Sequence, residues 1–319
     1  MTKRDPGVTA EGGTAPLFFP GFRRLDVDAG GVRFAGVTGG VGPPLLLLHG
    51  YPQTHIAWRK VALDLARSNT LVIPDLPGYG ASRPHAMAPR WTKRRAGAAL
   101  VALMRALGHQ HFALAGHDRG ARVGYRLVLD HPGTVVRFAS LAVIPTLDAM
   151  LAVDFRYARR SYHWFLLAQE HDLPERLLAA APDAFIDRAF ASMGGGSEEV
   201  IEPAAREAYR AAFRDPSVRH AICEDYRAAL DEDLAHDEAD RAAGRKLDCP
   251  VLVLWPGSRE SGGRGPVETW KAWADEVACA VTTGGHLQPE DRPAEVAAAL
   301  VPFFAGGAAE RMSGDADIW

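Results

Sequence analysis

The chain has 319 residues, of which 47% are hydrophobic and 24% are charged. These ordinary fractions exclude a disordered, collagen-like or coiled-coil protein, and the length predicts one large domain or two. The 36 basic and 39 acidic residues give a formal net charge of −3, so we expect neither nucleic acid nor an anionic membrane as a partner. Five of the basic residues are lysine and 31 are arginine, the side chain best suited to bind a carboxylate.

Cysteine usage and the N-terminal sequence bear on the compartment. Cys223, Cys249 and Cys279 lie far apart, which disfavours a disulfide framework and a zinc site and favours a reducing compartment. Residues 1–15 lack the apolar core of a signal peptide, and no apolar run approaches the roughly 18 residues that span a membrane. We therefore expect a cytoplasmic protein, with flexible termini at 1–15 and 307–319.

Short apolar runs alternate with longer helical stretches along most of the chain. This alternation predicts an α/β fold with an open, doubly wound and mostly parallel sheet. The uninterrupted apolar character of several runs suits strands that are covered on both faces. Strands are expected at 25–28, 32–37, 45–49, 70–75, 111–116, 136–143, 251–255 and 276–283, and helices at 56–67, 91–107, 119–131, 266–275 and 293–304.

Residues 149–245 depart from the alternation. They contain almost no strand signal, and their prolines divide the segment into several helices. A helical insertion of this length between two strands predicts a cap. The core is then discontinuous and comprises 16–148 and 246–306.

The expected strand at 111–116 runs into Gly116-His117-Asp118-Arg119-Gly120 and then into a helix. This is the context of the Gly-x-Ser-x-Gly nucleophile elbow, with aspartate in place of serine. The alternative interpretation is that Asp118 only caps the helix, a position that aspartate favours.

Two further motifs support the nucleophile. His49-Gly50-Tyr51-Pro52 follows a buried strand, where half of an oxyanion hole is expected, and His286 follows the last expected strand. In their order and context these motifs resemble the α/β-hydrolase superfamily across essentially the whole chain. The resemblance implies that superfamily's fold, with the helical insertion as its cap.

Aspartate as the nucleophile determines the chemistry that is expected. A carboxylate is already ionised at pH 7, and it can displace a leaving group from saturated carbon to form an alkyl ester. His286 would then activate the water that hydrolyses this ester. The backbone N–H groups of Tyr51 and Arg119 would stabilise the tetrahedral intermediate. Halide displacement and epoxide opening both fit this chemistry.

Two arginines distinguish between these reactions. Arg119 and Arg122 lie one and four positions after Asp118, so Arg122 returns to the face of the helix that carries Asp118. Their guanidinium groups fit a substrate carboxylate and offset its repulsion by the nucleophile. The alternative is that one or both arginines form structural ion pairs.

The chain resembles fluoroacetate (haloacetate) dehalogenases in particular. The matching segments span both the core and the insertion. The matches in the insertion are the more specific, because caps vary between hydrolases of different activity. They are HGYPQTH (49–55), DLPGYG (75–80), GHDRGARVGYRLVLDHP (116–132), IPT (144–146), YHWFLLAQ (162–169), CEDYRAA (223–229) and GHLQPED (285–291).

This resemblance implies hydrolysis of small 2-halocarboxylates by a homodimer. The sequence contains no nucleotide-binding loop, metal cluster or cofactor motif, so we expect neither a metal nor a cofactor. The resemblance implies that Asp118 is the nucleophile, that His286 is the base, and that Arg119 and Arg122 bind the carboxylate. It also implies a halide pocket, where neutral N–H and O–H donors replace the hydration of the departing anion. The residues implied for this pocket are His163, Trp164 and Tyr226, for which burial as core aromatics is the alternative.

One position departs from the family's pattern. The acid that orients the histidine is expected at residue 142, where this chain has alanine. Glu260 and Asp148 are the candidate substitutes, and Glu260 is slightly favoured. Ala142 favours one alternative function, a degenerate hydrolase that only binds small acids. An epoxide hydrolase, or another hydrolase of a small carboxylate substrate that uses the same ester chemistry, is the alternative enzyme.

Overall fold

The computed structural model describes residues 17–306, apart from 171, 195–199 and 258–264. Within these ranges nine strands form one sheet, in the order β1-β2-β4-β3-β6-β7-β8-β9, with β5 paired to β2. The strands are β1 (Arg23–Ala29), β2 (Val32–Gly39), β3 (Pro44–Leu48), β4 (Thr70–Pro74), β5 (Arg83–Pro84), β6 (Phe112–His117), β7 (Val135–Leu141), β8 (Val251–Pro256) and β9 (Val277–Thr282).

The sheet is mostly parallel. β2 runs antiparallel to its neighbours β1, β4 and β5, whereas every pairing from β4 through β3, β6, β7 and β8 to β9 is parallel. Every residue of β6 and β8 is buried, as expected for central strands that are covered on both faces. The predicted α/β architecture is confirmed.

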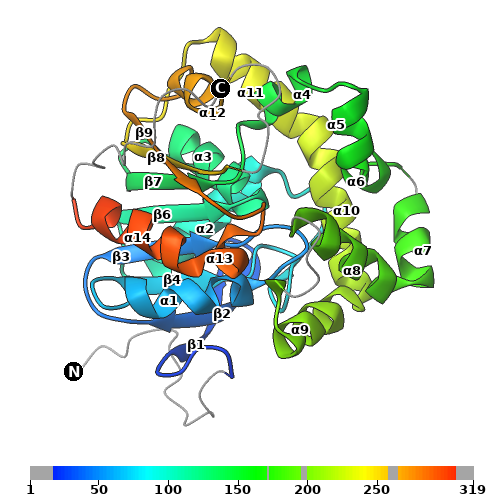
Figure 1. Ribbon diagram of the computed structural model, residues 1–319, viewed down its shortest axis with the longest axis horizontal. Coiled ribbons are helices and arrows are strands. Elements are labelled where there is room, and N and C mark those ends of the chain that lie inside the picture. The colour runs from blue at the N-terminus through cyan, green and yellow to red at the C-terminus, as the bar shows by residue number, and fades with distance from the viewer. Residues whose placement is uncertain (1–16, 171, 195–199, 258–264, 307–319) are drawn as a thin grey trace.

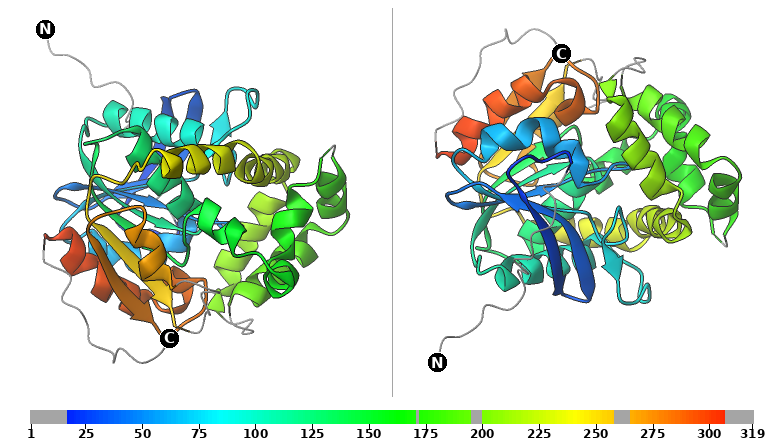
Figure 2. Two further views of the ribbon diagram at one scale, coloured as in Figure 1. Left: turned by 90° about the horizontal axis from the view of Figure 1, so that it is seen from above. Right: turned by 90° about the horizontal axis from the view of Figure 1, so that it is seen from below.

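Helices cover both faces of this sheet. α1 and α14 pack together on one face, and α2 and α3 pack together on the other (Figure 2). Outside the insertion, the helices are η1 (His55–Trp58), α1 (Arg59–Leu65), α2 (Lys93–Ala106), α3 (Arg119–Asp130), α12 (Pro266–Lys271), α13 (Gln288–Asp291) and α14 (Pro293–Phe304).

Several element boundaries differ from those expected. The helix expected at 56–67 is divided into η1 and α1, and α13 and the two-residue strand β5 were not expected. The strand expected at 136–143 ends at Leu141, because Ala142 has a φ of 64° and turns the chain out of the sheet. The termini expected to be flexible, 1–15 and 307–319, lie outside the described residues.

The segment between β7 and β8 lies beside the sheet as a group of helices, which we call the helical insertion (Figure 1). Its described residues contain no strand. The helices are α4 (Thr146–Leu151), α5 (Phe155–Arg160), α6 (Tyr162–Leu167), α7 (Leu173–Ala180), α8 (Pro182–Met193), α9 (Pro203–Phe213), α10 (Pro216–Leu230) and α11 (Glu232–Ala242).

Buried polar contacts join the helical insertion to the core. Arg126 of α3 forms ion pairs with Asp237 and Asp240 of α11. Tyr209 of α9 donates a 2.6 Å hydrogen bond to Glu290 of α13. Removing one partner of a buried ion pair costs several kcal/mol. These contacts therefore hold the helical insertion against the core. None of the helices in the described ranges is long and apolar enough to cross a membrane.

Candidate active site

Asp118 occupies a strained turn between β6 and α3. Its φ of 50° and ψ of −114° are unfavourable for a residue with a side chain, and such strain costs about 1–3 kcal/mol. The neighbouring glycines permit the turn, since a Cβ on Gly116 would lie 2.5 Å from the Ala121 nitrogen and one on Gly120 would lie 2.5 Å from the Leu48 oxygen. Asp118 stands at the N-cap position, but its side chain makes no capping hydrogen bond.

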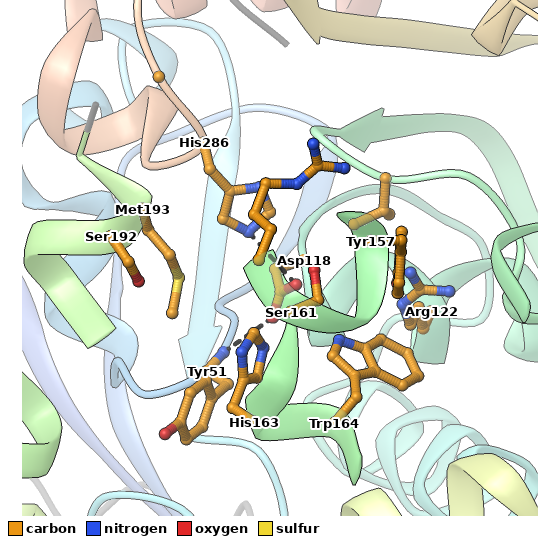
Figure 3. Close-up of a pocket in the computed structure, with 13 residues that line it drawn as sticks. Tyr51, Asp118, Arg122, Tyr157, Ser161, His163, Trp164, Ser192, Met193 and His286 are labelled. Carbon is orange, nitrogen blue, oxygen red and sulfur yellow. Dashed lines mark hydrogen bonds and ion pairs between the residues drawn. The ribbon is translucent and has the colours of Figure 1, made fainter. Parts of the chain in front are cut away.

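The carboxylate of Asp118 instead faces two groups from other loops (Figure 3). The backbone N–H of Tyr51 donates a 3.0 Å hydrogen bond to Oδ1, and Nε2 of His286 lies 3.3 Å from Oδ2. Burial alone would raise the pKa of Asp118, but the hydrogen bond and the charge of His286 outweigh it and hold this pKa well below its ordinary value. The carboxylate is therefore ionised at neutral pH.

His286 follows β9 and is held through its backbone. Its carbonyl oxygen accepts a 2.8 Å hydrogen bond from Nε2 of the buried His117, and its N–H donates to the carbonyl oxygen of Met193 at the end of α8. Burial, with a contribution from His286, lowers the pKa of His117 to about 4. His117 is thus neutral and carries its proton on Nε2, which places a rigid donor beneath the loop of His286.

The two arginines of α3 differ in their environment. The Nε and Nη2 atoms of Arg119 donate to the side chain and the carbonyl oxygen of Asp225 on α10, at 2.6 and 2.7 Å. Arg122 donates one 3.1 Å hydrogen bond to Thr146 and forms no ion pair with a carboxylate of the described residues. Arg119 therefore forms a structural ion pair with Asp225, as the alternative interpretation predicts. The charge of Arg122 has no carboxylate partner among the described residues.

Each guanidinium group has a buried nitrogen that donates no hydrogen bond among the described residues. Nη1 of Arg119 and Nε of Arg122 are buried and have no hydrogen-bond partner among the described residues. Both groups lie near the ring of Trp164, with Cζ at 5.0 and 4.8 Å from its centroid. A buried donor without a partner is costly, so this arrangement favours an anionic ligand that would accept from it.

Aromatic side chains form a contiguous cluster beside Asp118. The rings of Tyr51 and His163 are stacked with centroids 5.6 Å apart, and Tyr226 packs edge-on to Tyr51, His163 and Trp164. His163 and Trp164 line the cavity described next, as the sequence predicts for a ligand site, whereas Tyr226 is buried and is not one of the lining residues.

A cavity of about 330 Å³ contains the carboxylate of Asp118. Residues from the sheet loops and from the helical insertion line it: Tyr51, Asp118, Arg122, Val143, Tyr157, Arg160, Ser161, His163, Trp164, Ser192, Met193, Gly285 and His286. Arg119 is absent from this wall. Tyr157, Arg160, Ser161, Ser192 and Met193 were not predicted as site residues, because only the packing of α5 and α8 brings them to it.

Three positions bear on the acid partner of His286. Ala142 is fully buried at the end of β7. The carboxylate of Asp148 accepts hydrogen bonds from Arg241 and Trp273, at 2.8 and 2.7 Å. Glu260 lies outside the described residues. In the part of the chain that the structure describes, no cluster of histidine, cysteine, aspartate or glutamate could hold a metal ion.

Asp225 is a site-supporting residue that the sequence analysis did not identify. Besides Arg119, it contacts Lys93 and accepts a 3.0 Å hydrogen bond from Tyr79, and Lys93 in turn lies 3.3 Å from Asp233. Charges of opposite sign therefore alternate from Asp233 through Lys93 and Asp225 to Arg119. This buried series compensates Arg119 and fixes its position behind the cavity wall.

Comparison with known proteins identifies the relatives of the chain. The family model described as alpha/beta hydrolase fold matches residues 43–257. A fluoroacetate dehalogenase from Burkholderia sp. is 38% identical over 90% of this chain and 95% of its own. A soluble epoxide hydrolase from Corynebacterium sp. is 30% identical over 86% of this chain and 94% of its own.

A solved structure agrees with this relationship. A mutant of a "putative epoxide hydrolase" from Pseudomonas aeruginosa with bound MFA superposes with a TM-score of 0.88 at 49% identity, covering 92% of this chain and 98% of that one.

The series of buried charges predicts a large effect of Asp225 on stability. Asp225→Asn leaves Arg119 and Lys93 short of one negative charge, and we expect it to lower the free energy of unfolding by about 3–5 kcal/mol. Asp187→Asn, which removes a half-exposed partner of Arg210, should cost less than about 1 kcal/mol. Urea denaturation measures both, and equal losses would contradict the role given to Asp225.

The ion pairs of Asp225 with Arg119 and Lys93 also predict how the stability of the fold depends on pH. Burial would raise the pKa of Asp225, but Arg119 and Lys93 outweigh it and lower this pKa to about 2. A carboxylate with a depressed pKa stabilises the fold above its unfolded pKa of about 3.9, and this stabilisation is lost as the pH falls toward the folded value. The stability difference between wild type and Asp225→Asn should therefore be constant above about pH 5 and shrink below pH 4.

Proposed function

Because the chain belongs to the α/β-hydrolase fold family, we propose that it is a hydrolytic dehalogenase of small 2-halocarboxylates, fluoroacetate among them. The observation that carries the proposal is the pairing of an ionised Asp118 with an uncompensated Arg122 in one cavity. The similarity to a fluoroacetate dehalogenase over nearly the full length of both chains supports it.

The first step is displacement of the halide. Tyr51 holds Oδ1 of Asp118 by a hydrogen bond, so Oδ2 is the atom that attacks the carbon bearing the halogen. A carbon–oxygen bond forms, the carbon–halogen bond breaks, and the halide leaves with its electron pair. The products of this step are an alkyl ester on Asp118 and a free halide ion.

The substrate carboxylate has to lie close to the anionic nucleophile. Two unit charges 4 Å apart repel each other by about 4 kcal/mol at an effective dielectric constant of 20. Arg122 offsets this repulsion with a charge that no carboxylate of the described residues neutralises. Its Nε, which has no hydrogen-bond partner among the described residues, is the proposed donor to the carboxylate, whereas Arg119 is bound to Asp225 and supports the wall from behind.

The halide leaves toward the aromatic cluster. The side chains of His163 and Trp164 line the cavity, and the ring of Tyr226 packs edge-on against both. Fluoride is small and strongly hydrated, so it departs only when N–H or O–H donors replace its water. His163 and Trp164 are the cavity side of the proposed halide pocket, and Tyr226 supports them from behind.

The second step is hydrolysis of the ester. His286 takes a proton from water, and the resulting hydroxide adds to Cγ of Asp118. Negative charge then develops on Oδ1, which already accepts from the Tyr51 N–H, and the backbone N–H of Arg119 is the second proposed donor. Collapse of this intermediate releases a 2-hydroxy acid, regenerates Asp118 and returns the proton to solvent.

Epoxide hydrolysis is the second candidate function. It uses the same ester chemistry, and the phenol of Tyr157 lines the cavity, where it could protonate an epoxide oxygen. The relatives described as epoxide hydrolases support this alternative. An assay for diol formation beside one for halide release separates the two. The homodimer and the cytoplasmic location stay predictions.

The nucleophile is tested by Asp118→Asn. An amide does not displace halide, so we expect halide release from chloroacetate and fluoroacetate to fall by about 10⁴-fold or more. Asp187→Asn makes the same chemical change at a distance from the cavity and serves as the control. Halide release that survives in purified Asp118→Asn would rule out the covalent mechanism.

The base is tested by His286→Asn. This variant should form the ester but fail to hydrolyse it, and one equivalent of halide per chain should appear as a burst. Intact-mass spectrometry after incubation with chloroacetate should detect an adduct on Asp118. A variant that turns over without an adduct would remove His286 from the proposed mechanism.

The acid partner is tested by comparing two carboxylates. Glu260→Gln should leave the halide burst intact and slow steady-state turnover by as much as about 10⁴-fold, since the imidazolium loses its partner. Asp148→Asn should slow it far less, because Asp148 is bound to Arg241 and Trp273. Adding Ala142→Asp to Glu260→Gln should restore turnover, and equal rates in Glu260→Gln and wild type would exclude Glu260.

A further inference from the structure

The cavity is larger than the substrate proposed above requires. Its volume of about 330 Å³ would hold roughly ten water molecules, each of which occupies about 30 Å³ in the liquid. A haloacetate has only a handful of heavy atoms. A haloacetate would therefore fill only part of the cavity.

A second guanidinium group, that of Arg160, lines the cavity. Arg160 is the last residue of α5, and its side chain is exposed at the cavity. Within the described ranges no carboxylate lies within ion-pair distance of it, and Cζ is 5.9 Å from the centroid of the Tyr157 ring. The hydroxyl-bearing side chains of Ser161 and Ser192 also line the cavity (Figure 3).

Two guanidinium groups line the cavity, and a single substrate carboxylate placed against Arg122 leaves the other without an anionic partner. Neither Arg122 nor Arg160 forms an ion pair with a carboxylate of the described residues. The carboxylate beside the halogenated carbon can satisfy Arg122. Arg160 then remains available to a second anionic group on the same molecule.

We propose that the protein accepts 2-halo acids that carry a second carboxylate at their far end. Arg122 binds the carboxylate next to the halogen, and Arg160 binds the distal one. This inference rests on the proposed function and extends its substrate class. The reaction is unchanged: the carbon–halogen bond is replaced by a carbon–oxygen bond, and a 2-hydroxy dicarboxylate, a halide ion and a proton are released.

Halide release from three substrates tests the proposal. Chloroacetate reports the basic reaction, 2-chlorosuccinate carries the second carboxylate, and 2-chlorobutyrate has the same chain length without it. Wild type should have a lower KM for 2-chlorosuccinate than for 2-chlorobutyrate. Arg160→Gln should raise the KM for 2-chlorosuccinate about tenfold more than the KM for 2-chlorobutyrate, the effect of losing one charge-assisted hydrogen bond.

Two further variants serve as controls. Arg159→Gln removes a neighbouring exposed arginine that does not line the cavity, and it should leave the ratio of the two KM values at the wild-type level. Arg160→Lys keeps the charge and should recover part of the preference for 2-chlorosuccinate. If Arg160→Gln raises the KM values of all three substrates equally, Arg160 only attracts anions to the cavity, and the proposal of a second carboxylate site is wrong.

The outcomes separate this inference from the proposed function. Turnover of chloroacetate with none of 2-chlorosuccinate overturns the dicarboxylate site and leaves the dehalogenase proposal standing. Absence of halide release from all three substrates overturns the dehalogenase proposal itself. Preferred turnover of 2-chlorosuccinate that is lost in Arg160→Gln and kept in Arg159→Gln supports both.

Discussion

The strained backbone of Asp118 is the constraint on which the rest of the site depends. A residue with a side chain keeps a positive φ only where its surroundings leave it no alternative, and here β6 is fixed between β3 and β7. The loops after the parallel strands leave the same edge of the sheet, so Tyr51, after β3, lies beside one carboxylate oxygen and His286, after β9, beside the other. The sheet therefore positions the reacting groups before any ligand enters.

The helical insertion completes the site mainly by supplying charge. α3 carries Arg119, Arg122 and Arg126, and burial of three guanidinium groups on one helix would be prohibitive without partners. Aspartates of α10 and α11 neutralise Arg119 and Arg126, whereas Arg122 receives only the hydroxyl of Thr146. The insertion thus selects which cation stays available to a ligand, in addition to closing the cavity.

The sequence was most informative where a residue has to satisfy a local rule. Gly116 and Gly120 around Asp118, and the buried strands β6 and β8, could be recognised because close backbone approach and two-sided burial restrict residue type. The partner of Arg119 could not be predicted, because Asp225 lies 106 positions away and a helix surface carries many aspartates. The positions of Tyr157 and Arg160 in the cavity wall could not be predicted either, because they depend on how α5 packs and not on a sequence pattern within α5.

The hydrogen bond between the His286 N–H and the Met193 carbonyl has a mechanical consequence. Met193 ends α8 and forms part of the wall that encloses the cavity. An outward movement of α8 has to break this bond or pull the loop of His286 away from Asp118. The position of the base is therefore tied to the wall formed by α8 as well as to the end of β9.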